Sequence, residues 1–198
     1  MKKLTAALLG LALVTAPAAP ALAGWKLVEQ GETVEVAKGS LSVTPGEAWN
    51  RWSVRPIKTS EIWTLDGTTL NELYFVSDLA NGETLYRDAN KKEAPLPKFS
   101  SSMDLSEIPE FVESSTRIAL NTSVFTMTAV EPAQLAGHPA VRFTYDYSVE
   151  GSALKRKGLG VAAVVGGKLQ LVTFVAPETF YFERDLPKVE KLIASATM

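Results

Sequence analysis

Apolar and polar residues alternate with a period of two along much of the chain from Leu27 onward, a pattern typical of β-strands with one buried face. In the first half, the alternating or aromatic-rich segments are 34–43, 48–54, 61–65 and 70–76. Gly39-Ser40 and Asp66-Gly67 are turn-forming pairs. The first half therefore predicts an opening hairpin over 34–43, followed by three further strands.

The second half contains the clearest strand pattern. Apolar residues recur at every second position over 141–149, with Arg142, Thr144, Asp146 and Ser148 between them, so one face is predicted to be core and the other wet. The segments 158–165 and 168–176 flank Gly166-Gly167, whose glycines permit the positive φ angles of a type I′ turn. This combination predicts a two-residue hairpin.

Helical spacing occurs twice. After Asp104 and Ser106, either of which is a suitable cap, apolar residues follow one helix face as far as Ala119, with Pro109 tolerated in the first turn. Near the C-terminus, Asp185 is a candidate cap for a helix with an apolar i, i+3, i+4, i+7 pattern that ends at Ala196. The segment 87–102 shows no periodicity and is predicted to be the long loop of the domain.

Runs of strands with segregated helices predict an α+β domain with a mostly antiparallel sheet flanked by helices. From a strand at 122–130 onward, the element order passes through Gly137-His138-Pro139, the hairpin at Gly166-Gly167 and the last helix. This order resembles the PsbP-like α/β/α sandwich. The first half, with Trp49-Asn50-Arg51-Trp52, is similar to bacterial envelope proteins of no known activity. The resemblance implies an accessory or binding module more often than an enzyme.

The N-terminal segment predicts a cleavable signal peptide over residues 1–23. Lys2 and Lys3 precede an apolar core at 8–14, and Ala21-Leu22-Ala23 matches the small-residue site of a signal peptidase. The core is too short for a stable membrane anchor. The 198 residues include no cysteine, which excludes a lipid-anchored form and disulfides. We therefore expect one soluble globular domain, 24–198, in the periplasm or outside the cell.

Composition narrows the classes of function. The formal net charge is −2, and so small a charge does not indicate the basic surface that nucleic-acid binding requires. One histidine and no cysteine exclude a closed zinc, iron or copper site, and no calcium-binding loop motif occurs, so no metal and no cofactor are expected. A catalytic triad would need His138 as its base. Ser152 and Lys155 have S-x-x-K spacing but lie in a strand or loop, where the motif has no function. We predict no catalytic residues.

Aromatic and basic residues provide the candidate binding site. The candidate ligand-binding residues are Trp49, Arg51, Trp52, Arg55 and Trp63. Tryptophan offers a large apolar face with one polar N–H group. Trp49 and Trp52, however, face opposite sides of a strand, so at least one of the two belongs to the core. The basic cluster 155–157 is interpreted as a guard against pairing at a sheet edge.

Two functional hypotheses follow. The first is a non-enzymatic periplasmic accessory protein that binds an envelope protein through a sheet face or through the 87–102 loop. The alternative is a carrier of a small apolar or sugar ligand in an aromatic groove, which an enclosed apolar cavity would favour. An enzyme that uses His138 or carboxylates is the third possibility, and it requires His138 within hydrogen-bond reach of a serine and an acid.

Overall fold

The computed structural model describes residues 24–149 and 151–198, so the predicted signal peptide lies outside the described residues. An eight-stranded, fully antiparallel sheet forms the middle layer, in the order β1-β4-β5-β6-β10-β9-β8-β7. The strands of the first half are β1 (Trp25–Val28), β4 (Trp49–Trp52), β5 (Ser60–Thr64) and β6 (Glu72–Leu79). Those of the second half are β7 (Val124–Leu135), β8 (His138–Ser148), β9 (Lys155–Val165) and β10 (Lys168–Pro177).

The sheet consists of two four-stranded halves that meet where β6 pairs with β10. Within each half, strands adjacent in the sheet are consecutive in the chain, apart from the small sheet inserted between β1 and β4. That insertion pairs β2 (Val34–Glu35) with β3 (Ser42–Val43), which confirms the predicted opening hairpin. The pairing of β6 with β10 is therefore the long-range contact that joins the two halves.

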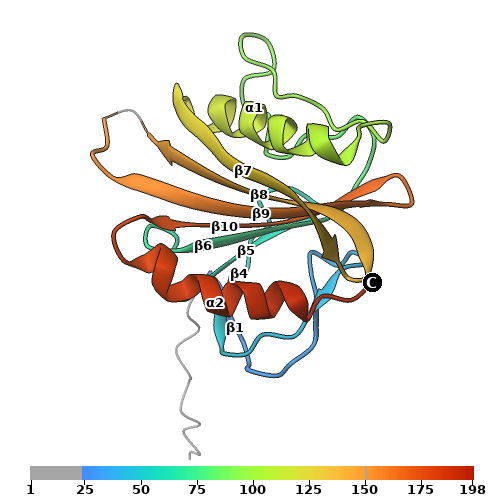
Figure 1. Ribbon diagram of the computed structural model, residues 1–198, viewed down its shortest axis with the longest axis vertical. Helices are drawn as coiled ribbons and strands as arrows, with labels where there is room; N and C mark the ends of the chain where they lie inside the picture. Colours follow the sequence, from blue (N-terminus) through green and yellow to red (C-terminus); the bar gives the residue numbers. More distant parts are fainter. Residues whose placement is uncertain (1–23, 150) are drawn as a thin grey trace, which may run out of the picture.

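One α-helix covers each face of the sheet (Figure 1). The first, α1 (Ile108–Leu120), is preceded by the short 3-10 helix η1 (Leu105–Glu107) and buries Ile108, Phe111 and Val112 against one face. The second, α2 (Tyr181–Ala194), buries Phe182, Val189 and Leu192 against the other. The predicted α+β class, an antiparallel sheet flanked by helices, is confirmed. We call the two sides of the sheet the α1 face and the α2 face.

Several local predictions are confirmed. Gly166 and Gly167, with φ angles of 59° and 76°, form the hairpin turn between β9 and β10. Val141, Phe143 and Tyr145 of β8 are buried in the core of the α1 face, whereas Arg142 projects from the α2 face and pairs with the α2 residue Glu190. The segment 87–102 contains no named strand or helix.

Two local predictions are wrong. Asp185 does not cap the C-terminal helix, because α2 begins at Tyr181 and places Asp185 in its second turn, fully buried. The basic cluster 155–157 does not guard a sheet edge, since β9 is an inner strand between β10 and β8. Alternate residues of this cluster instead face opposite sides of the sheet: Lys157 pairs with Glu183 of α2, and Arg156 lies on the α1 face beside Tyr147.

Candidate functional site

A pocket of about 480 Å³ opens on the α1 face, between the C-terminal end of α1 and strands β6, β10, β9 and β8. Four tyrosines contribute to its wall: Tyr74, Tyr86, Tyr145 and Tyr147. We call it the tyrosine pocket. Its other apolar lining includes Ile62, Ala119, Leu120 and Val175, and its charged lining residues are Glu72, Arg87 and Arg156. The site therefore combines a large aromatic surface with both signs of charge.

The period of two along β8 explains why Tyr145 and Tyr147 share one wall of this pocket. Directly across from Tyr145 on β9 lies Gly158, and across from Phe143 lies Gly160. A Cβ atom at either glycine would overlap the ring of the facing aromatic residue. The two glycines thus allow Phe143 and Tyr145 to pack closely against β9, and Tyr145, although buried, lines the tyrosine pocket.

Hydrogen bonds hold two of the tyrosines in place. The Tyr74 hydroxyl donates to the Leu85 carbonyl over 2.7 Å, and the Tyr86 hydroxyl lies 3.0 Å from Thr116 Oγ1 of α1. The rings of Tyr74 and Tyr86 pack with centroids 5.4 Å apart. Burial raises the pKa of both phenols above the usual value, and it raises the pKa of Tyr147 to about 12. All three phenols are consequently neutral at physiological pH.

Glu72 and Arg156 bring opposite charges to the same pocket from β6 and β9. Burial raises the pKa of the Glu72 carboxyl, and the positive charge of Arg156 only partly opposes this shift. Arg156 Nη2 donates to the Thr69 carbonyl over 2.8 Å, which fixes the guanidinium at the pocket edge. Among residues 24–149 and 151–198, no hydrogen bond or ion pair engages the Glu72 carboxylate.

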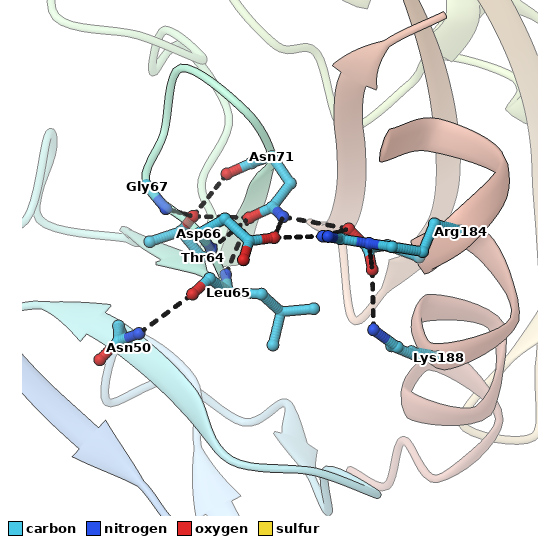
Figure 2. A network of polar contacts seen from close by, with 9 residues as sticks. Asn50, Thr64, Leu65, Asp66, Gly67, Asn71, Arg184 and Lys188 are labelled. Atoms are coloured by element: carbon cyan, nitrogen blue, oxygen red, sulfur yellow. Dashed lines mark hydrogen bonds and ion pairs between the residues drawn. The ribbon is translucent and has the colours of Figure 1, made fainter. Parts of the chain in front are cut away.

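The α2 face contains a polar network of a different kind (Figure 2). The buried Asp185 carboxylate accepts hydrogen bonds from Arg184 Nε at 2.8 Å, Lys188 Nζ at 2.8 Å and Asn71 Nδ2 at 3.0 Å. Burial alone would raise the pKa of Asp185, but hydrogen bonds from Arg184 and Lys188 lower it below the usual value. Arg184 also pairs with Asp66.

Asn71 extends this network into the loop between β5 and β6. Its Oδ1 accepts hydrogen bonds from Thr64 Oγ1 at 2.6 Å and from the Leu65 amide at 2.8 Å, while its Nδ2 donates to Asp66 at 2.8 Å. Because each polar group of Asn71 and Asp185 is matched, the network attaches the 65–71 loop to α2 and leaves no group aimed at a ligand. We interpret it as a structural anchor.

A second hollow, of about 490 Å³, lies beside the 87–102 loop and is lined by loop residues such as Thr84, Asp88, Lys91 and Lys98. Loops build most of this hollow, whereas strands and α1 build most of the tyrosine pocket, and preorganised binding sites are more often built on rigid elements. The tyrosine pocket is therefore the better candidate site.

The structure places the sequence-predicted binding residues in three environments. Trp49 and Trp63 are fully buried in the core of the α2 face, with Trp63 Nε1 donating to Glu61 Oε1 over 2.8 Å. Trp52 is 38% exposed and stacks on Trp25, with ring centroids 6.4 Å apart. Of the two arginines, Arg51 lies 3.9 Å from Glu61, and Arg55 donates to the Lys58 carbonyl over 3.5 Å. None of the five residues lines the tyrosine pocket.

The hypothesis of an enzyme that uses His138 finds no support in the described part of the chain. His138 begins β8 at the hairpin with β7, and no hydrogen bond joins its side chain to a serine or an acid among those residues. No group of three or more histidine, cysteine, aspartate or glutamate side chains gathers there in a metal-binding arrangement. In the same residues, no helix is long and apolar enough to cross a membrane.

Sequence reasoning did not identify the tyrosine pocket, although part of its signal is visible in the chain. Tyr145 and Tyr147 were expected on the core face of their strand, and the core there is incompletely filled. Glu72 alternates along β6 with the buried residues Tyr74 and Val76, and an acid in such a register is an indication of function. The part of the pocket wall that α1 contributes depends on how the helix packs on the sheet, which the periodicity of the sequence does not specify.

Comparisons with known proteins show similarity of structure only. No protein-family model and no curated protein matches the chain. A cyanobacterial PsbP (CyanoP) from Synechocystis is similar in structure, with a TM-score of 0.42 and 11% identity over 89% of this chain and 82% of that one. This agrees with the resemblance that the second half of the sequence predicted.

Two further solved structures are similar at the same level. LpqN, a protein involved in cell envelope biogenesis of Mycobacterium tuberculosis, has a TM-score of 0.39 and 11% identity over 87% of this chain and 89% of that one. The immunity protein TplEi from Pseudomonas aeruginosa has a TM-score of 0.40 and 12% identity over 86% of this chain and 50% of that one. Likeness at this level assigns no ligand or partner to the chain.

Proposed function

We propose that this chain is a non-enzymatic binding protein that works outside the cytoplasm and holds a small ligand in the tyrosine pocket. The observation that carries the proposal is the pocket itself: about 480 Å³ of space lined by four tyrosines, with a carboxylate and a guanidinium that form no ion pair with each other. Apolar concave sites with a few polar groups are typical of small-molecule binding. The extracytoplasmic location is supported by the signal-peptide pattern of residues 1–23.

The alternative hypothesis from the sequence, a carrier with an aromatic site, is kept in modified form. Tyrosines on the α1 face take the role that the sequence assigned to tryptophans, because Trp49 and Trp63 are needed in the core of the α2 face. A ligand in this pocket would contact residues of both sheet halves, since Tyr74 lies on β6 and Tyr145 lies on β8.

A first experiment fills the pocket mouth without disturbing the core. Ala119 is exposed, lies at the C-terminal end of α1 and lines the pocket, whereas its neighbour Ile118 is 38% exposed and does not. Binding is followed by the fluorescence of N-phenyl-1-naphthylamine, a neutral apolar probe, and native mass spectrometry of the purified mature chain detects any retained small molecule. We expect Ala119→Trp to weaken probe binding about tenfold or more, and Ile118→Trp to leave it within about twofold.

Either of two results would contradict the proposal. One is the absence of probe binding and of any retained molecule in the unmodified chain. The other is equal weakening by Ala119→Trp and Ile118→Trp, which would place the probe elsewhere on the surface.

A protein partner at the 87–102 loop is the second candidate. The helices cover much of both sheet faces, and the tip of this loop, 90–94, is exposed and projects from the body of the molecule beside α1 (Figure 1). Deletion of 90–94 would abolish capture of such a partner while probe binding in the tyrosine pocket is retained. Native capture of the mature chain and of the deletion variant from its own envelope fraction distinguishes the two candidates.

A further inference from the structure

Glu72 and Arg156 lie on the same face of the sheet, on strands β6 and β9, with only β10 between those two strands. The positive charge of Arg156 acts on the Glu72 carboxyl by lowering its pKa against the effect of burial, yet the two side chains form no ion pair. Opposite charges at an open pocket normally close into a pair when they can reach each other. Here they form no pair, and both side chains line the tyrosine pocket.

We propose that the ligand of the tyrosine pocket is a small zwitterion, with an ammonium group at Glu72, an acidic group at Arg156 and an apolar or aromatic body against the tyrosines. The proposal rests on the function proposed above and adds the chemical class of the ligand. A zwitterion is the one class of ligand that gives both Glu72 and Arg156 a partner at once.

The Glu72 end favours an ammonium group. A carboxylate that lacks a hydrogen-bond partner in a partly desolvated site is destabilised, and a bound cation removes that penalty. The pKa of Glu72, which burial raises, is the sign of this penalty. Tyrosine rings are negative on their faces and attract cations, so the aromatic wall adds to the same preference.

The Arg156 end favours an acid. One of its guanidinium nitrogens is held by the Thr69 carbonyl, which orients the group, and its remaining N–H groups are suited to bind a carboxylate or a phosphate. Orientation by the protein lowers the entropy that the side chain loses when the ligand binds. Arg87, an exposed residue of the pocket lining, is a second positive charge near the same opening.

The test compares ligands that share one body and differ only in charged groups. The aromatic set is phenylalanine, phenethylamine and hydrocinnamate, and the aliphatic set is 2-aminooctanoate, heptylamine and octanoate. Isothermal titration of the full mature chain at neutral pH measures each affinity. In at least one set we expect the zwitterion to bind about tenfold or more tightly than both singly charged analogues, because each loses one charge-assisted contact.

Three variants assign the contacts. Glu72→Gln is expected to weaken binding of the zwitterion and of the amine about tenfold, and to leave binding of the acid unchanged or tighter. Arg156→Gln is expected to weaken binding of the zwitterion and of the acid, and to leave binding of the amine unchanged or tighter. Lys157→Gln is the matched control, because Lys157 neighbours Arg156 but pairs with Glu183 on the α2 face. This control should leave all affinities within about twofold.

Several results would overturn the inference while the proposed function stands. These are tighter or equal binding of a singly charged analogue in both sets, equal responses of Glu72→Gln and Lys157→Gln, and failure of all six compounds to bind when N-phenyl-1-naphthylamine still binds in a manner sensitive to Ala119→Trp. Absence of binding by the neutral probe as well would instead count against the proposed function.

Discussion

The two faces of the sheet show two ways of covering the same strands with one helix. On the α2 face, Phe174 packs on Phe182 with ring centroids 5.5 Å apart, and the buried Asp185 is matched by three hydrogen-bond donors. On the α1 face, a pocket remains between the end of the helix and the sheet, and Glu72 is left without a partner among the described residues. The difference leads us to expect that the α2 face supplies stability, and it places the proposed site on the α1 face.

The largest expected effect separates the faces by stability. Asp185→Ala removes the buried acceptor of Arg184, Lys188 and Asn71, and we expect the free energy of unfolding to fall by about 3 kcal/mol in urea denaturation at pH 7. The folded-state pKa of Asp185 is lowered, so its contribution is present above the unfolded value and is lost as the pH falls through the folded value. The deficit of the variant should therefore shrink in acid. A deficit that is independent of pH would show that the charge of Asp185 is not what stabilises this face.

A second prediction compares two neighbouring glycines of β9. In Gly160→Ala the new methyl group meets Phe143, which is fully buried, and we expect a loss of about 2–3 kcal/mol. In Gly158→Ala the methyl group meets Tyr145, which has pocket space to move into, so the loss should be only about 1 kcal/mol. Urea denaturation measures both losses. Gly158→Ala should also weaken binding of the naphthylamine probe. Equal losses with no change in probe binding would contradict a role of Tyr145 in the wall of the binding site.

A third prediction concerns a substitution that stabilises the protein. Glu72→Gln removes a partly buried carboxylate whose charged form is disfavoured in the fold, and we expect a gain of no more than about 1 kcal/mol at neutral pH. Because the folded-state pKa of Glu72 is raised, the penalty is absent below the unfolded value near 4.3 and grows as the pH rises through the folded value. Thermal unfolding from pH 4 to pH 8 measures the gain. A destabilised variant at pH 7 would mean that Glu72 has a partner in solution.

The smallest expected effect is that of an exposed ion pair on the α2 face. Glu190 is half-exposed and lies 2.9 Å from Arg142, which also contacts Glu131. Glu190→Gln should change the free energy of unfolding by no more than about 0.5 kcal/mol, because exposed pairs contribute little. Urea denaturation of Glu190→Gln, measured in parallel with Asp185→Ala, tests this. A loss comparable to that of Asp185→Ala would show that the network around Asp185 is not the special feature of this face.

The sequence predicted the layers of this fold better than it predicted the site. Periodicity along β8 and the glycine pair at 166–167 are local signals, and the structure confirms both. The predicted role of Asp185 was wrong because the sequence pattern of an aspartate that caps a helix is the same as that of an aspartate buried in the first turns of the helix. The pocket could not be predicted, since it depends on where α1 stops relative to β8 and on the distance between Glu72 and Arg156 across β10.

The pairing of β6 with β10 has a consequence for the order of folding. Each sheet half is built mainly from strands that are neighbours in the chain, whereas this pairing closes the longest loop, and non-local contacts form slowly. The tyrosine pocket takes Glu72 and Tyr74 from one half and Thr173, Arg156 and Tyr145 from the other. It therefore exists only after the halves have joined, so a bound ligand selectively stabilises the completed sheet and slows the separation of its halves.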